Sequence, residues 1–162
     1  WFESIAEDMY LCCRARLAGY AVRALTTSGY RHWQGSSFGG NRVTNNQLVS
    51  TFRRRALSER NKSFVMVLTC PAPFLQVIVP IHIVSLLLEG IFLTLLRRDM
   101  RIFRVVYLPA LAEMVNRRQF LIGVRSSIQK KRTIRWQNFF AAFTFKPQKA
   151  SLLLKHGVPH LS

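Results

Sequence analysis

The sequence has 162 residues, of which 24 are Lys or Arg and 7 are Asp or Glu, so its formal net charge is +17. Its length is sufficient for one folded unit, since a chain of about 150 residues buries roughly 70% of its unfolded surface. The charge favours an anionic partner, and the 49% of hydrophobic residues favours a membrane surface over nucleic acid, because the basic residues bracket apolar runs and no recognised nucleic-acid-binding motif is present.

The first fifty residues predict a compact α/β element. No initiator Met or signal sequence precedes Trp1, so we expect the sequence to be a piece of a longer protein. Apolar residues recur at helical spacing over Asp8 to Leu17, and Gly19 follows where a left-handed cap closes a helix. Tyr20 to Leu25 and Tyr30 to Trp33 have the composition of strands. A Gly/Ser-rich loop and a polar, irregular stretch are expected from there to residue 50.

The middle of the chain changes from basic to apolar. Residues 51–68 predict a basic amphipathic helix, and Phe74 to Leu96 is long and apolar enough for a membrane span, which needs about 20 such residues. Basic clusters on both sides of this run select no orientation for a single span. Two half-helices kinked near Pro80, re-entrant or interfacial, would keep both clusters on the cytoplasmic face, and we favour them. The remaining alternative is a buried core helix.

The last part of the chain is again basic. Ile102 to Val115 is a shorter apolar stretch broken at Pro109, and Asn116 to Arg135 has the composition of a helix on anionic headgroups, or else of a solvated basic face. A tail with one short helix over residues 152–154 follows. We therefore divide the chain into four parts: 1–50, 51–73, 74–97 and 98–162.

Few residues can carry chemistry in so basic a chain. Glu7 and Asp8 stand just before a predicted helix, whose positive amino end favours ionised carboxylates, and capping of that helix would by itself explain Asp8. His32 lies beside Trp33 and the glycine-rich loop, where it is either structural or a metal ligand.

Two segments taken together resemble a known family. Residues 7–20, EDMYLCCRARLAGY, and residues 30–37, YRHWQGSS, resemble the closing part of the catalytic domain of family 2 glycosyltransferases with the GT-A fold, where a Glu-Asp-x-Asp-Leu-x-x-Arg stretch starts a helix and His-x-x-Gly-Ser follows at a similar interval. Arg60-Asn61 looks like the Arg-Asn pair that opens the family's next helix, and Arg125 to Arg132 is similar to a basic segment of rhamnosyltransferase-like members. The resemblance covers most of the chain.

The resemblance implies a fold and a set of roles. The fold would be an α/β fragment, the C-terminal part of a GT-A nucleotide-diphospho-sugar transferase domain, followed by mainly α membrane-associated helices. Asp8 would be the general base of an inverting transfer of a sugar, such as rhamnose. His32 would complete the coordination of a divalent manganese or magnesium ion on the donor diphosphate. Glu7 and Trp33 would bind the acceptor sugar.

The implied partners are a nucleotide-sugar donor, a glycan or lipid-linked acceptor and an anionic membrane surface, without nucleic acid, at the cytoplasmic face of a bacterial inner membrane. Tyr10 stands where many family members have a second acid. The Asp-x-Asp motif and the nucleotide-binding βαβ half, which the family places upstream, are absent from the sequence, so we do not expect it to catalyse transfer alone. The alternative function is a non-enzymatic membrane-anchoring or interaction module, in which Glu7-Asp8 is a cap and His32 is structural.

Overall fold

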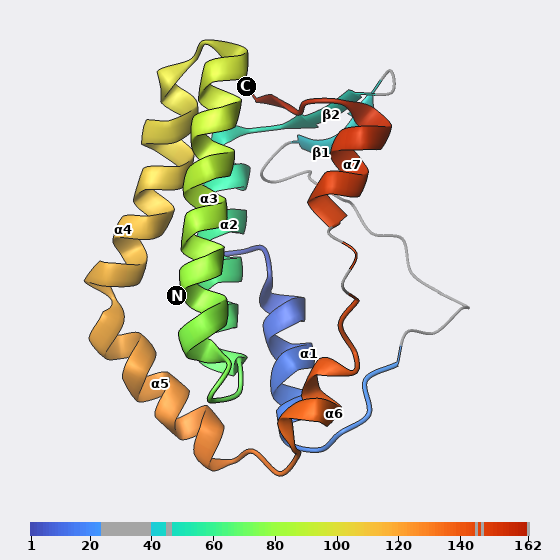
Figure 1. Ribbon diagram of the computed structural model, residues 1–162, viewed down its shortest axis with the longest axis vertical. Coiled ribbons are helices and arrows are strands. Elements are labelled where there is room, and N and C mark those ends of the chain that lie inside the picture. The colour runs from blue at the N-terminus through green and yellow to red at the C-terminus, as the bar shows by residue number, and fades with distance from the viewer. Residues whose placement is uncertain (24–39, 45–46, 145, 147, 162) are drawn as a thin grey trace.

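The computed structural model describes residues 1–23, 40–44, 47–144, 146 and 148–161, and these residues are predominantly helical (Figure 1). Helix α3 packs against the π-helical segment that leads into α4. Helices α1 and α6 lie toward one end of the molecule, and α7 lies with the strands toward the other. The elements in chain order are α1 (Glu7–Leu17), β1 (Gly40–Thr44), β2 (Gln47–Ser50), α2 (Phe52–Thr69), α3 (Leu75–Arg97), the π-helical η1 (Ile102–Tyr107), α4 (Leu108–Asn116), α5 (Arg118–Lys130), α6 (Trp136–Phe140), α7 (Gln148–His156) and β3 (His160–Leu161).

The expected α/β fragment of a GT-A domain is wrong. The described strands form one small sheet in the order β1-β2-β3, with β1 antiparallel to β2 and β2 parallel to β3. Strands β1 and β2 come from the stretch expected to be irregular, while residues 20–23, expected to begin a strand, have no regular structure. All helices from α2 to α7 lie between β2 and β3 in the sequence, so this sheet closes the edge of a helical body and is not a doubly wound core.

The first helix has the predicted position and the predicted end. Helix α1 ends at Leu17, and Gly19 has a φ of +89°. The backbone N–H of Gly19 donates to Arg16 O at 2.9 Å, and that of Tyr20 donates to Ala15 O at 3.0 Å. These two bonds form a Schellman motif, which pairs carbonyls that the end of a helix leaves without partners.

Helix α2 is the centre of the helical body. It begins after Thr51, whose Oγ1 accepts a hydrogen bond from the N–H of Arg54 at 3.1 Å. Helices α1, α3, α4, α5 and η1 all contact it. It therefore buries polar as well as apolar residues, and the buried polar ones are Glu59, Asn61, Ser63 and Thr69. The Arg60-Asn61 pair lies in the middle of this helix, whereas the resemblance implied that the pair opens it.

Helix α3 is one continuous helix of 23 residues with Pro80 inside it, so the two expected half-helices are not found. At 1.5 Å per residue it is about 35 Å long, slightly more than the hydrocarbon thickness of a bilayer. Among the described residues it is the one helix long and apolar enough to cross a membrane, by length and composition.

Two clusters of buried apolar residues hold the helices together. The larger cluster joins α1, α2, α5 and α6, and the smaller one joins α3 to η1. Polar and charged side chains lie between the two clusters, on the sides of α2 and α3 that face each other. The larger cluster is formed by Cys13, Leu17, Phe64, Val65, Leu68, Leu121, Ile128 and Phe139, and the smaller by Leu86, Leu93, Ile102, Val106 and Tyr107.

Candidate functional site

Glu7 and Asp8 form an exposed acidic pair in the first turn of α1. The N-cap residue is Ala6, and the helix has no side-chain capping bond, so capping does not explain Asp8. The Asp8 carboxylate makes no hydrogen bond or ion pair with the part of the chain that the structure describes. It is an exposed carboxylate at the positive end of a helix dipole.

A polar clamp from α2 positions the segment that leads into α1. The Asn61 side chain is fully buried, and its Nδ2 lies 2.7 to 2.8 Å from the carbonyl oxygens of Phe2, Ser4 and Ile5. Arg60 Nη1 contacts the Glu3 carboxylate at 2.9 Å. The segment needs such anchoring because Glu3, Ile5 and Ala6 all have positive φ, a conformation that is unfavourable for residues with a side chain.

Two of the four predicted site residues fall on parts of the chain that the structure does not describe. His32 and Trp33 lie outside the described residues, so the predicted metal ligand and the predicted stacking residue are not placed. Within the described residues no three side chains of His, Cys, Asp or Glu come together as a metal site. The adjacent pair Glu7-Asp8 is too small a ligand set for an octahedral divalent ion on its own.

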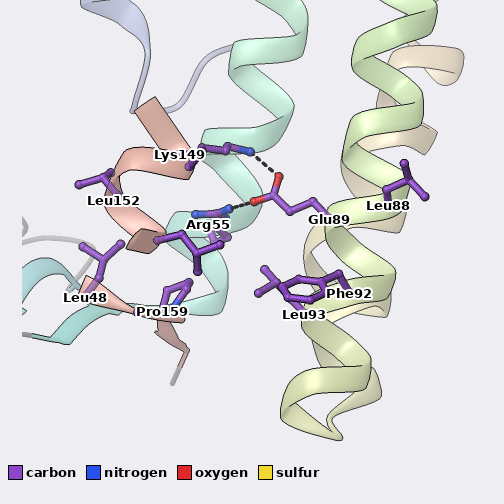
Figure 2. Close-up of a pocket in the computed structure, with 12 residues that line it drawn as sticks. Leu48, Arg55, Leu88, Glu89, Phe92, Leu93, Lys149, Leu152 and Pro159 are labelled. Carbon is purple, nitrogen blue, oxygen red and sulfur yellow. Dashed lines mark hydrogen bonds and ion pairs between the residues drawn. The ribbon is translucent and has the colours of Figure 1, made fainter. Parts of the chain in front are cut away.

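A partly buried ion network that the sequence did not predict joins α2, α3 and α7. Glu59, with a side chain only 1% exposed, lies 3.0 Å from Arg55 Nε and 2.8 Å from Lys149 Nζ. The first of these contacts is ionic without the geometry of a hydrogen bond. Glu89 reaches from α3 toward the same two cations (Figure 2), pairing with Arg55 and lying 2.6 Å from Lys149 Nζ. Arg55 also donates to the hydroxyl of Tyr107 at 3.3 Å.

The charged groups of the network stabilise one another. Burial acts to raise the pKa of Glu59, but attraction to Arg55 and Lys149 outweighs it, so the pKa of this carboxyl lies below its ordinary value. Burial acts to lower the pKa of Arg55, but its acidic neighbours, chiefly Glu59, raise it overall. Burial raises the pKa of Tyr107, which remains a neutral phenol. Two cations and two carboxylates thus compensate one another between the helices.

A cavity lies on each side of this network, each with a volume of about 460 Å³. The first, here called the α7 cavity, is drawn in Figure 2, where Leu48, Leu152 and Pro159 lie opposite Phe92 and Leu93 of α3. The second, here called the α6 cavity, lies between α1, α2, α3 and the aromatic residues of α6. Glu89 and Lys149 line both cavities, so the network forms the wall between them.

The α6 cavity contains one cation, Lys62, that takes no part in the ion network. Lys62 lines it and makes no hydrogen bond or ion pair with any described residue. Burial lowers the pKa of Lys62, although Glu59 opposes that effect. On the opposite wall, His82 Nε2 lies 2.8 Å from Ser63 Oγ, and Ser63 Oγ donates to Glu59 O at 2.7 Å. Because the Ser63 proton is used in that bond, Ser63 accepts from His82.

The outer side of α3 is an apolar stripe, here called the α3 stripe. Its members recur at intervals of three and four residues, so they lie on one face of the helix, and each is about half or more exposed. The polar members of the helix, His82 and Glu89, turn the other way, into the helical body. This division is typical of a helix that contacts lipid on one side. The α3 stripe is formed by Val77, Ile81, Val84, Leu88, Ile91, Phe92, Leu95 and Leu96.

One sequence signal could have revealed the network. Glu89 and His82 interrupt an otherwise apolar run, and ionisable residues in such a helix are expected to face protein partners. Their partners, Arg55 and Lys149, are remote in sequence and carry no comparable signal. Comparison with protein-family models, with curated proteins and with solved structures finds no match.

Proposed function

We propose that the chain takes part in an inverting glycosyl transfer at a membrane, from a nucleotide-sugar donor to a polysaccharide or lipid-linked acceptor, with Asp8 as the general base. The observation that carries this proposal is the exposed Asp8 carboxylate at the amino end of α1, which has no partner among the described residues. Arg60 and Asn61 hold in place the segment that precedes it. A helix cap would have explained this acid, and it is not one.

The chemistry needs one well-placed base. Asp8 would remove the proton of an acceptor hydroxyl while the oxygen attacks the anomeric carbon of the donor. The bond from that carbon to the nucleoside diphosphate breaks as the new glycosidic bond forms, and the configuration inverts. Glu7, exposed beside Asp8, would accept hydrogen bonds from acceptor hydroxyls. His32 and Trp33 keep their proposed roles in holding a divalent ion and in stacking on the acceptor sugar.

The membrane part of the proposal rests on the α3 stripe and on the net charge of +17. An apolar face binds the acyl boundary, and basic residues near it add about 1 kcal/mol each by attraction to anionic headgroups. We place this surface at the cytoplasmic face of a bacterial inner membrane, where a lipid-linked acceptor is within reach.

The test is sugar transfer in membranes from cells that express the protein, using labelled dTDP-rhamnose and related donors. Asp8→Asn should lower the rate of sugar transfer at least about a hundredfold, the usual effect of removing a general base. The matched control is Glu113→Gln, which removes an acid from a surface ion pair with Arg117. Unchanged transfer in Asp8→Asn would exclude Asp8 as the base.

A second candidate function is a non-enzymatic membrane anchor. The observation that favours it is the α3 stripe itself, which needs no chemistry. If membranes carrying the protein transfer no sugar from any donor tested, and Asp8→Asn binds vesicles as the parent does, the anchor is the function.

A further inference from the structure

Among the described residues, the charges around the α6 cavity leave one positive charge, that of Lys62, without an ion pair. Arg55 and Lys149 are paired with Glu59 and Glu89, so these four charges sum to zero. Lys62 projects into the same region without an ion pair among the described residues. A protonated His82 would only add to the positive charge. An uncompensated ammonium next to apolar walls is unfavourable unless an anion joins it.

The walls of the cavity are suited to an aliphatic chain. Phe139, Phe140 and Phe143 line one side, and Ile78 and Leu86 of α3 line another. The volume of about 460 Å³ lies in the range of sites that hold small organic ligands. The cavity therefore combines one cation with an apolar interior, which matches an amphiphile carrying a single negative charge.

The cavity also adjoins the α3 stripe. Its α3 wall includes Ile78, His82 and Ser85. Each of these follows a member of the α3 stripe by one residue, which is a rotation of about 100° around the helix. Ser85 is exposed at the rim. A lipid in contact with the stripe thus needs to move only around one side of α3 to reach Lys62.

We propose that the α6 cavity binds one anionic membrane phospholipid, with the lipid phosphate paired to Lys62 and an acyl chain among the phenylalanines of the α6 region. This inference concerns binding only and does not depend on glycosyl transfer. A lipid seated here would lie against α1 as well, because Met9, the residue after Asp8, lines the cavity.

The test is calorimetric titration of the purified full chain, in a nonionic detergent, with dioctanoyl phosphatidylglycerol. We expect one molecule to bind per chain. Lys62→Gln should weaken binding about tenfold or more, the usual effect of losing a hydrogen bond to a charged group. Lys62→Arg should restore most of the affinity. The matched control Lys131→Gln removes an exposed lysine outside the cavity and should bind as the parent does.

Two further ligands and one further variant separate the parts of the proposal. Dioctanoyl phosphatidylcholine tests the need for net negative charge, and inorganic phosphate tests the need for a chain; both should bind at least about tenfold more weakly. Ser85→Phe places a ring at the rim and should weaken phosphatidylglycerol binding with Lys62 intact. Equal affinity of Lys62→Gln and Lys131→Gln would overturn the proposal, and so would equal affinity of either comparison ligand.

Discussion

The ring of Tyr107 occupies the space that a side chain at Gly90 would need. A β-carbon at position 90 would stand 2.8 Å from Cγ of Tyr107 and 3.0 Å from Cδ2 of Phe103. Tyr107 is fully buried, and its hydroxyl accepts a hydrogen bond from Arg55, so the ring is held from two sides. Gly90 therefore sets how closely α3 approaches η1, and it does so one residue after Glu89.

Gly90→Ala is expected to lower the stability of the protein. Alanine improves helix propensity by about 1 kcal/mol, but overpacking a tight contact usually costs about 1 to 3 kcal/mol, and the buried ring has no free space. Denaturant unfolding of the two proteins in the same detergent measures the difference. Gly123→Ala is the control, because Gly123 is exposed on α5 with no atom within 4 Å of an added β-carbon; it should stabilise slightly. Equal gains in stability for Gly90→Ala and Gly123→Ala would show that the Tyr107 ring moves aside.

Glu59→Gln should destabilise the protein by about 3 to 5 kcal/mol, the usual effect of breaking a buried ion pair by removing one partner. The variant leaves Arg55 and Lys149 to share Glu89. Glu113→Gln is the control, since its partner Arg117 is exposed and the pair contributes about 0.3 to 0.5 kcal/mol. Similar melting temperatures for the two variants would contradict a structural role for the network.

The same carboxyl predicts an acid dependence. The pKa of Glu59 in the folded protein lies below its ordinary value of 4.5. Its stabilising contribution is therefore complete above pH 4.5 and is lost as the pH falls through the lowered folded pKa. The melting temperature of the parent should fall more steeply below pH 4.5 than that of Glu59→Gln. Parallel curves would show that other carboxyls dominate the acid transition.

Local sequence signals predicted the parts of this fold that depend on local interactions. The helical spacing of residues 8–17 and the position of Gly19 predicted α1 and its Schellman end. The length of the apolar run allowed a single span, but we favoured two half-helices kinked near Pro80, and α3 is instead one continuous helix. Pro80 did not divide it, although a proline inside a helix often does so.

The remaining features depend on partners that are distant in the sequence. Strand β2 pairs with β3, which lies far from it in the sequence, so no local spacing shows that pairing. The motif at residues 7–8 identified an exposed acid pair but implied a wrong fold around it. Lys62 was one of several basic residues on a predicted amphipathic helix. Only the packing of α1, α3 and α6 around it shows that it faces a cavity.

Lys62→Met should leave the lipid-free protein as stable as the parent, or more stable. Burial lowers the pKa of Lys62 below 10.5 in the folded protein, so its charged form opposes folding. The stability of the parent should therefore rise as the pH increases through the lowered pKa toward 10.5, and the variant should lack this contribution. Thermal melts of both proteins at several alkaline pH values measure this difference in stability. A marked loss of stability in the variant would show that the ammonium has a partner in the folded protein.

Asn61→Ala should release the segment in front of α1. It removes the donor to three backbone carbonyls and leaves buried acceptors unpaired, at about 1 to 3 kcal/mol for an unsatisfied group. Hydrogen exchange of residues 2–10 should become faster, and any transfer that depends on Asp8 should fall with it. Asn116→Ala, at the exposed end of α4, is the control. Unchanged exchange in Asn61→Ala would mean that the positive-φ segment holds its conformation unaided.

Val84→Asp combined with Leu88→Asp should detach the protein from vesicles of phosphatidylglycerol and phosphatidylcholine. Each carboxylate in the hydrocarbon costs about 2.5 to 3.5 kcal/mol at the centre of an apolar helix. Both positions are exposed, so the substitutions disturb few contacts within the protein. Leu154→Asp is the control, because Leu154 is 88% exposed on α7 and lies outside the α3 stripe. Vesicle flotation of the parent, the double variant and Leu154→Asp measures membrane binding. A double variant that floats with the parent would place the membrane contact on another face, such as the basic residues of α5.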